Sequence, residues 1–242
     1  MIRLILILLF LVVFFLISIP IYLVEWLIGK RNPQLRDRSS LAIVRVACRI
    51  VGFLAGIRLT VKGLENVPKD RPVLFIGNHR SFFDIIVTYP LMARPTGFLA
   101  KIELKKVPFL AWWMYFVNCL FLDRKDNRQG LQVILAAIDK IKNGISIVIF
   151  PEGTRNKEAS QLDLLPFHEG SFKVATRSGC PVVPMAISGT SAVFEDHMPW
   201  VRSVPVTVTF GEPIETAELD RARQKQLSGK VREQLLEMLK NS

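Results

Sequence analysis

The chain reads Pro72-Val73-Leu74-Phe75-Ile76-Gly77-Asn78-His79-Arg80-Ser81-Phe82-Phe83-Asp84 where an apolar run gives way to a polar turn. Residues 72–77 are typical of a buried strand that ends at the turn, and residues 82–89 of the start of a helix. Further strands are expected over 96–100, 118–122, 145–150, 182–188 and 204–210, with helices over 107–117, 130–142, 170–178 and 215–241. Strands that alternate with helices indicate an α/β domain, with a mostly parallel central sheet flanked by helices.

The N-terminal end carries an apolar run long enough to cross a membrane. No charged residue occurs from Leu4 to Leu23, and about 20 apolar residues are needed to cross the hydrocarbon layer. A cleaved signal peptide is the alternative, but no small-x-small cleavage site follows the run. We therefore expect residues 1–29 to form an N-terminal membrane helix, which Pro20 would bend or end near one interface.

Basic residues follow this run more often than they precede it. Arg3 lies before it, whereas Lys30, Arg31, Arg36, Arg38, Arg45 and Arg49 come soon after. The positive-inside rule then places the main domain on the cytoplasmic face of the membrane, which we expect to be the inner membrane of a bacterium.

A second apolar stretch, residues 41–57, is interrupted by Arg45 and Arg49. It is expected to form an interfacial helix beside the first, or to pair with it in a helical hairpin that dips into one leaflet. The sequence leaves both arrangements open. The expected organisation is a membrane helix over 1–29, a basic linker with the interfacial helix over 30–62, and the α/β domain over 63–242.

The net charge of +11 suits two kinds of partner. Nucleic acid is one, but the basic residues are spread out and no zinc, helix-turn-helix or aromatic ribonucleoprotein motif accompanies them. An anionic lipid bilayer explains better why many of them flank the apolar N-terminus. We therefore expect a bilayer partner and no nucleic acid. No cluster of His, Cys, Asp and Glu has metal-ligand spacing, so no metal is expected.

The polar turn offers a histidine with a carboxylate five residues later, His79 and Asp84. Histidine titrates near neutral pH, which suits a general base that removes a hydroxyl proton. A carboxylate can accept the other ring N–H, fix the tautomer and stabilise the imidazolium. The alternative is a capping or buried polar histidine, with Asp84 as a solvated helix residue.

A second motif, Phe150-Pro151-Glu152-Gly153-Thr154-Arg155, follows another expected strand. Gly153 lets the backbone approach a ligand closely, Thr154 offers a hydroxyl, and Arg155 can grip two phosphate oxygens at once. Glu152 would hold Arg155 or bond a hydroxyl of the ligand. An ordinary turn with an exposed arginine is the alternative. Sites in parallel sheets gather beyond the carboxyl ends of the strands, so we expect the two motifs to meet.

His79 and Asp84 also match the H-x-x-x-x-D motif, and with the other blocks the chain resembles the glycerolipid acyltransferases, most closely the 1-acylglycerol-3-phosphate acyltransferases. The resemblance runs from about Val73 to Ile187 and includes Lys101-Ile102-Glu103-Leu104, Phe121-Leu122-Asp123-Arg124, Leu165-Pro166-Phe167 and Val182-Val183-Pro184-Met185. It implies that His79 and Asp84 are catalytic and that the 152–155 turn binds the acceptor phosphate. It also places Lys101 and Arg124 near that phosphate, although Asp123 and Arg124 could equally form a surface ion pair.

The activity that the resemblance implies is acyl transfer in phospholipid synthesis. A fatty acyl group would pass from acyl-CoA or acyl-ACP, with no further cofactor, to the free hydroxyl of lysophosphatidic acid. Another lysophospholipid or glycerol 3-phosphate is the alternative acceptor, and thioester hydrolysis is an alternative reaction. A catalytically silent membrane-binding protein is the alternative of another class. Residues 107–117 lack the glycines usual in such proteins, which leaves acyl-chain preference open.

Overall fold

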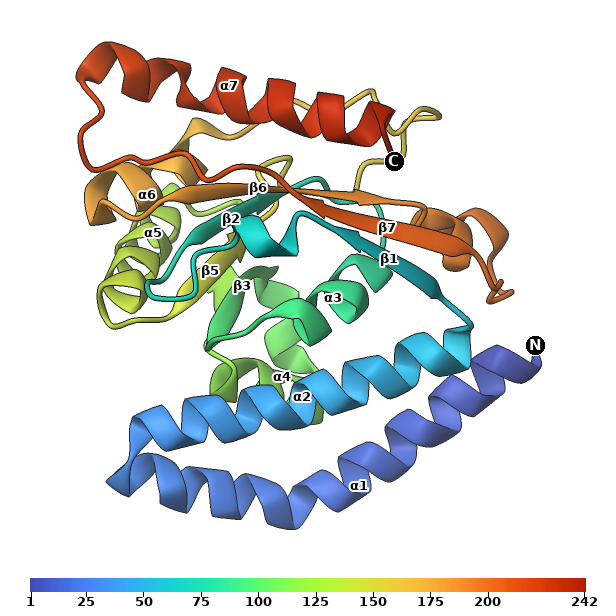
Figure 1. The fold of residues 1–242 in the computed structure, drawn as a ribbon. Helices are drawn as coiled ribbons and strands as arrows, with labels where there is room; N and C mark the ends of the chain where they lie inside the picture. The colour runs from blue at the N-terminus through green and yellow to red at the C-terminus, as the bar shows by residue number, and fades with distance from the viewer.

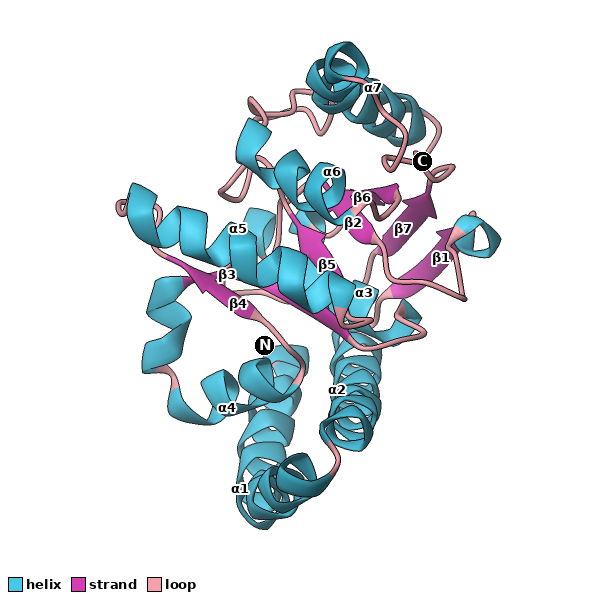
Figure 2. Ribbon diagram, turned by 90° about the vertical axis from the view of Figure 1, so that its left-hand side faces the viewer, coloured by secondary structure: helices cyan, strands magenta, loops and turns pink.

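One sheet of seven strands organises the chain, in the order β1-β7-β6-β2-β5-β3-β4 (Figures 1 and 2). The computed structural model describes the backbone of residues 1–242 and every side chain except that of Asn127. The strands are β1 Arg58–Lys62, β2 Leu74–Gly77, β3 Thr96–Lys101, β4 Leu120–Leu122, β5 Ser146–Ile149, β6 Val182–Ser188 and β7 Pro205–Phe210. Neighbouring strands are parallel except for β6 and β7. This confirms the expected mostly parallel sheet.

Helices cover both faces of this sheet (Figure 1). They are α1 Ile2–Arg31, α2 Pro33–Ala55, α3 Phe83–Thr88, α4 Pro108–Phe116, α5 Asn127–Lys142, α6 Lys173–Ser178 and α7 Arg221–Lys240. Val73 and Phe75 pack in a core with residues of α2 and α3, whereas Leu74 and Ile76 pack in a second core with residues of α5, α6 and α7. Successive strand residues point to opposite faces, so a strand covered on both sides is apolar throughout.

The two N-terminal helices form a hairpin along the underside of the α/β domain (Figure 1). Asn32 ends α1, and its side chain accepts a hydrogen bond from the backbone N–H of Leu35 at 3.0 Å, so it also caps α2. At the other end, Arg3 donates to the carbonyl oxygen of Leu54 at 3.3 Å. The hairpin is therefore closed at both ends.

The first helix is also fastened to α4. Tyr22 donates its hydroxyl to the carbonyl oxygen of Phe109 at 2.7 Å, and the indole N–H of Trp113 donates to Ser18 at 2.9 Å. Within the part of the chain that the structure describes, α1 alone is long and apolar enough to cross a membrane, and most of its apolar segment is exposed. Its composition matches the expectation for a membrane helix, while its packing ties it to the domain.

Three elements differ from the sequence-based expectations. Strand β1 pairs with β7, so the sheet begins at Arg58, ahead of the expected domain boundary at residue 63. Residues 169–172 form a 3₁₀ turn before α6. The last helix begins at Arg221 rather than at residue 215, because Ile214 is still paired with Val182 and Asp220 provides the N-cap.

We predict that charges placed on the exposed side of α1 release the protein from membranes. Leu9 and Leu16 are 59% and 61% exposed. A lysine at the centre of a helix embedded in hydrocarbon costs about 2.5–3.5 kcal/mol. The double variant Leu9→Lys/Leu16→Lys should therefore leave a larger fraction of the folded protein in the supernatant after sedimentation with anionic vesicles than the intact chain does.

Deletion of residues 1–29 should release the protein only in part. The apolar side chains of Phe53, Phe109 and Trp112 stay exposed after the deletion. The comparison is the intact chain, sedimented with the same vesicles.

Binding of the double lysine variant as complete as that of the intact chain would contradict the membrane role of α1.

Candidate active site

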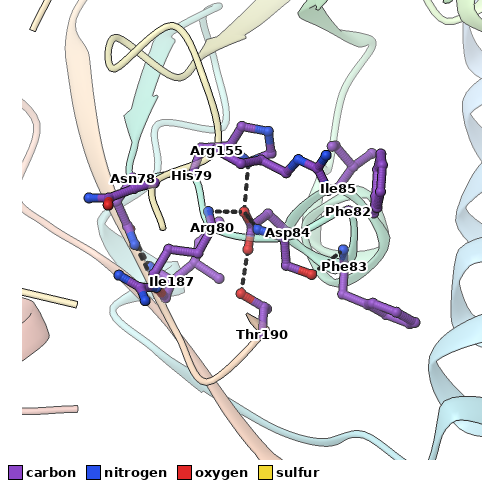
Figure 3. A network of polar contacts seen from close by, with 12 residues as sticks. Asn78, His79, Arg80, Phe82, Phe83, Asp84, Ile85, Arg155, Ile187 and Thr190 are labelled. Carbon is purple, nitrogen blue, oxygen red and sulfur yellow. Dashed lines mark hydrogen bonds and ion pairs between the residues drawn. The ribbon is translucent and has the colours of Figure 1, made fainter. Parts of the chain in front are cut away.

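The turn after β2 brings His79 and Asp84 into contact (Figure 3). The Nδ1 atom of His79 lies 2.7 Å from Oδ2 of Asp84. The Asp84 side chain is 1% exposed and that of His79 is 16% exposed. A carboxylate only accepts hydrogen bonds, so Nδ1 carries the proton and Nε2 has the free lone pair. The imidazole is thus arranged to take a proton at Nε2.

The carboxylate of Asp84 is held from several directions. Its Oδ2 atom also accepts the backbone N–H groups of Arg80 at 2.8 Å and Ser81 at 2.9 Å. Its Oδ1 atom accepts the hydroxyl of Thr190 at 2.5 Å. These bonds fix the carboxylate and, through it, the plane of the His79 ring. Thr190 was not found from the sequence, because a threonine 106 residues from Asp84 leaves no spacing to recognise.

The second motif meets the first at this edge of the sheet. The ring of His79 stacks on that of Phe150, with centroids 4.3 Å apart and planes 8° apart. The backbone N–H of His79 donates to Glu152 at 3.0 Å, and its carbonyl oxygen accepts the N–H of Asn156 at 2.7 Å. The convergence of the two segments, expected from the carboxyl ends of β2 and β5, is therefore present.

Glu152 is buried and bonded to protein groups. One oxygen holds the backbone of His79, and the other accepts the amide of Asn156 and the N–H of Leu165, both at 2.9 Å. Its described hydrogen bonds do not include Arg155, so it braces the loop instead of holding the arginine. Gly153 has φ 71°, a conformation that favours glycine.

Arg155 and Thr154 face outward beside this brace. The guanidinium carbon of Arg155 lies 3.9 Å from the centroid of the Phe82 ring, and Nη1 lies 3.3 Å from Oε1 of Glu195. Its side chain is 33% exposed, and Thr154 is exposed as well. Both can therefore reach a ligand. Glu195 was not singled out from the sequence, because it belongs to no recognisable spacing. Phe82 lies within the His79–Asp84 segment but was given no role there.

Lys101 and Arg124 lie farther along the same edge. Lys101 is the last residue of β3, two strands from β2, and Arg124 follows the end of β4, three strands from β2. At about 4.8 Å per strand, that places their backbones roughly 10 and 15 Å from the His79 turn. Both are exposed, and Lys101 pairs with Glu103 at 3.0 Å. The structure thus gathers His79, Asp84 and residues 152–155 and leaves these two cations at the periphery.

Ser81 has no free hydroxyl for nucleophilic chemistry. Its Oγ donates to Glu195 at 2.6 Å and accepts the N–H of Phe83 at 2.9 Å, and the residue is buried. Ser81 therefore lies just before α3 and supports its start through the bond to the Phe83 N–H. Among the described side chains, no group of three or more His, Cys, Asp and Glu residues is arranged to hold a metal ion.

Residues 58–188 match the model of the acyltransferase family. The chain belongs to this family. This acyltransferase is 31% identical over 192 residues to the 1-acyl-sn-glycerol-3-phosphate acyltransferase of Saccharomyces cerevisiae, a match that covers 79% of the chain and 63% of the yeast protein. With the protein of the same name from Borreliella burgdorferi it shares 30% identity over 202 residues, which cover 84% of the chain and 80% of the relative.

A solved structure extends the likeness to the whole chain. The crystal structure of the 1-acyl-sn-glycerophosphate (LPA) acyltransferase PlsC from Thermotoga maritima aligns with a TM-score of 0.72 and 26% identity. The alignment covers 99% of this acyltransferase and 97% of that chain, so the N-terminal helices are included. Thr190 and Glu195 lie beyond the residues that the family match spans.

We predict that His79→Ala lowers kcat by roughly 10²–10⁴-fold, the usual contribution of a general base. Asp84→Asn should also lower kcat strongly, because an amide cannot stabilise the imidazolium as a carboxylate can. Thr190→Val removes one of several bonds to Asp84 and should raise the activation free energy by about 1.5–3 kcal/mol, which lowers kcat roughly 10–150-fold. Steady-state kinetics with circular dichroism as a folding control measures all three. Near-normal turnover of folded His79→Ala would remove this residue from the mechanism.

Proposed function

We propose that this acyltransferase moves a fatty acyl group from acyl-CoA or acyl-ACP to the free hydroxyl of lysophosphatidic acid and so makes phosphatidic acid. The observation that carries the proposal is the 2.7 Å contact of His79 with Asp84 beside an outward-facing Arg155. The yeast and Borreliella relatives are named for the same acceptor. A base for the hydroxyl and a cation for the phosphate are the two groups that this acceptor needs.

The chemistry follows from the free Nε2 atom of His79. As the acceptor oxygen attacks the thioester carbonyl, its proton passes to Nε2 and the ring becomes an imidazolium. Asp84, on the other ring nitrogen, stabilises that charge. When the tetrahedral intermediate collapses, the carbon–sulfur bond breaks and the imidazolium returns the proton to the thiolate. The ester, the thiol and the neutral histidine are the products.

The phosphate is assigned to the 152–155 turn. Arg155 offers a planar fork that matches two phosphate oxygens, and Thr154 offers a hydroxyl at the same exposed surface. Lys101 and Arg124, at the periphery, would add attraction for the acceptor phosphate or for the phosphates of the donor. Glu152 contributes by holding the turn against His79.

The N-terminal hairpin is assigned to the membrane, on the cytoplasmic face of a bacterial inner membrane. Exposed apolar side chains along α1 and the basic residues that follow it support this assignment. The close packing of α1 on α2 and α4 favours a hairpin in one leaflet over a spanning helix. Residues 1–29 would then be the embedded helix and residues 30–57 the basic interfacial segment, and the catalytic domain would run from β1 at Arg58 to residue 242.

An acceptor panel tests the proposal. Purified protein in vesicles is given labelled acyl-CoA or acyl-ACP with lysophosphatidic acid, glycerol 3-phosphate, a lysophospholipid with a larger headgroup, or no acceptor. Mass spectrometry identifies the product lipid, and a thiol assay measures donor cleavage. Phosphatidic acid as the main product supports the proposal. Thiol release at the same rate without acceptor would indicate a hydrolase, and no release would indicate a silent protein.

We predict that Arg155→Lys raises the KM for lysophosphatidic acid far more than the KM for the acyl donor. A lysine presents a single charged point where arginine presents a fork. Losing one charge-assisted hydrogen bond costs about 1.5–3 kcal/mol, or roughly tenfold or more in binding. Lys157→Ala removes an exposed cation two residues away and serves as the matched control. A rise in the donor KM instead would mean that the 152–155 turn binds the acyl donor and not the acceptor phosphate.

A further inference from the structure

The connection between β6 and β7, residues 189–204, reaches both halves of the site. Thr190 bonds to Asp84 beneath the catalytic histidine. Five residues later, Glu195 bonds to the turn that carries His79 and to Arg155. The mechanism above uses Asp84 and Arg155 but assigns nothing to Glu195, which lies outside the residues that the family match spans.

The carboxylate of Glu195 makes three contacts. Its Oε2 accepts the hydroxyl of Ser81 at 2.6 Å, and its Oε1 accepts the backbone N–H of Phe82 at 2.8 Å. The same Oε1 lies 3.3 Å from Nη1 of Arg155. The Glu195 side chain is only 17% exposed, so water screens this ion pair less than one on the open surface. Glu195 therefore links the His79 turn to the arginine.

Phe82 contacts Arg155 from a different side than Glu195 does. The guanidinium of Arg155 lies over its ring at 3.9 Å, while the backbone of the same residue is bonded to Glu195. A carboxylate and an aromatic face thus restrict a side chain that is otherwise long and flexible. Arginine has five N–H donors, and among the described residues its guanidinium donates one hydrogen bond, to Glu195. The other donors remain for a ligand.

We propose that Glu195 is a positioning residue for the acceptor phosphate. It holds Arg155 against Phe82 with the remaining N–H groups free, and it ties that guanidinium to the segment that carries the catalytic histidine. The distance between the phosphate-binding group and the base is then set by one side chain. The inference rests on the proposed role of Arg155 in holding the phosphate.

The test compares Glu195→Ala, Glu195→Gln and Asp196→Asn in the full chain, with lysophosphatidic acid and acyl-CoA varied in turn. Glu195→Ala should raise the acceptor KM about tenfold, as expected for loss of a charge-assisted bond. Glu195→Gln keeps an acceptor oxygen but loses the charge, so its rise should be about threefold. The donor KM should stay within about twofold of the intact chain for both.

Asp196→Asn is the matched control. It removes one negative charge from the neighbouring position, where the exposed Asp196 side chain accepts a hydrogen bond from Ser191 at 2.9 Å. It should leave the acceptor KM within about twofold, because an exposed charge bonded to a neutral hydroxyl contributes little and the asparagine oxygen can still accept the bond from Ser191. An equal effect of Asp196→Asn and Glu195→Gln would show that net charge matters and would overturn the inference.

A double-mutant cycle with Arg155→Ala decides whether Glu195 acts through the arginine. In the Arg155→Ala background, Glu195→Ala should leave the acceptor KM unchanged. An undiminished further rise there would overturn the inference. So would an acceptor KM that is unchanged or lower in the Glu195 single variants, since a lower value means that Glu195 competes with the phosphate. A lower melting temperature together with a lower kcat and similar rises in both KM values would show that Glu195 has a structural role only, and this result would also overturn the inference.

The same experiment separates this inference from the proposed function. If the intact chain does not acylate lysophosphatidic acid, the proposed function fails. If it does, and Arg155→Lys raises the acceptor KM while the Glu195 variants do not, only the role of Glu195 fails.

Discussion

The buried carboxylate of Asp84 is the constraint on which the rest of the site depends. A charge removed from water must be met by hydrogen-bond donors. The donors are the His79 ring, the backbone N–H groups of Arg80 and Ser81, and the hydroxyl of Thr190. Three of the four come from the turn after β2, but the fourth comes from beyond β6. The His79–Asp84 pair can therefore be complete only when these two strands lie side by side.

The sheet provides this adjacency and secures it at the end of the strands. The side chain of Asn78 both donates to the carbonyl oxygen of Ile187 and accepts its N–H, each at 2.8 Å, which extends the pairing of β2 with β6. On the other side of β2, Glu152 attaches the loop after β5 to the backbone of His79. Asn78 and Glu152 therefore fix the position of the turn after β2 relative to the strands on either side of it.

Much of this could be predicted from sequence, for identifiable reasons. Strands buried on both faces appear as continuous apolar runs, and local motifs such as His79 with Asp84 keep a fixed spacing. Strand β1 could not be recognised in this way, because it is mostly exposed. Thr190 and Glu195 could not be found either, since their partners lie 106 and 114 residues away. The attachment of α1 to α4 could not be found either, because Tyr22 and Ser18 bond to residues 87 and 95 positions away.

The closed hairpin also has a consequence for which measure of acceptor concentration sets the reaction rate. Because α1 is bonded to α2 at one end and to α4 along its length, hairpin and catalytic edge form one packed body. With the hairpin in one leaflet, as we propose, enzyme and lysolipid acceptor would both diffuse in the plane of the membrane. The rate would then depend on the mole fraction of lysolipid among the membrane lipids. Inert lipid added to the same vesicles would slow turnover by surface dilution alone.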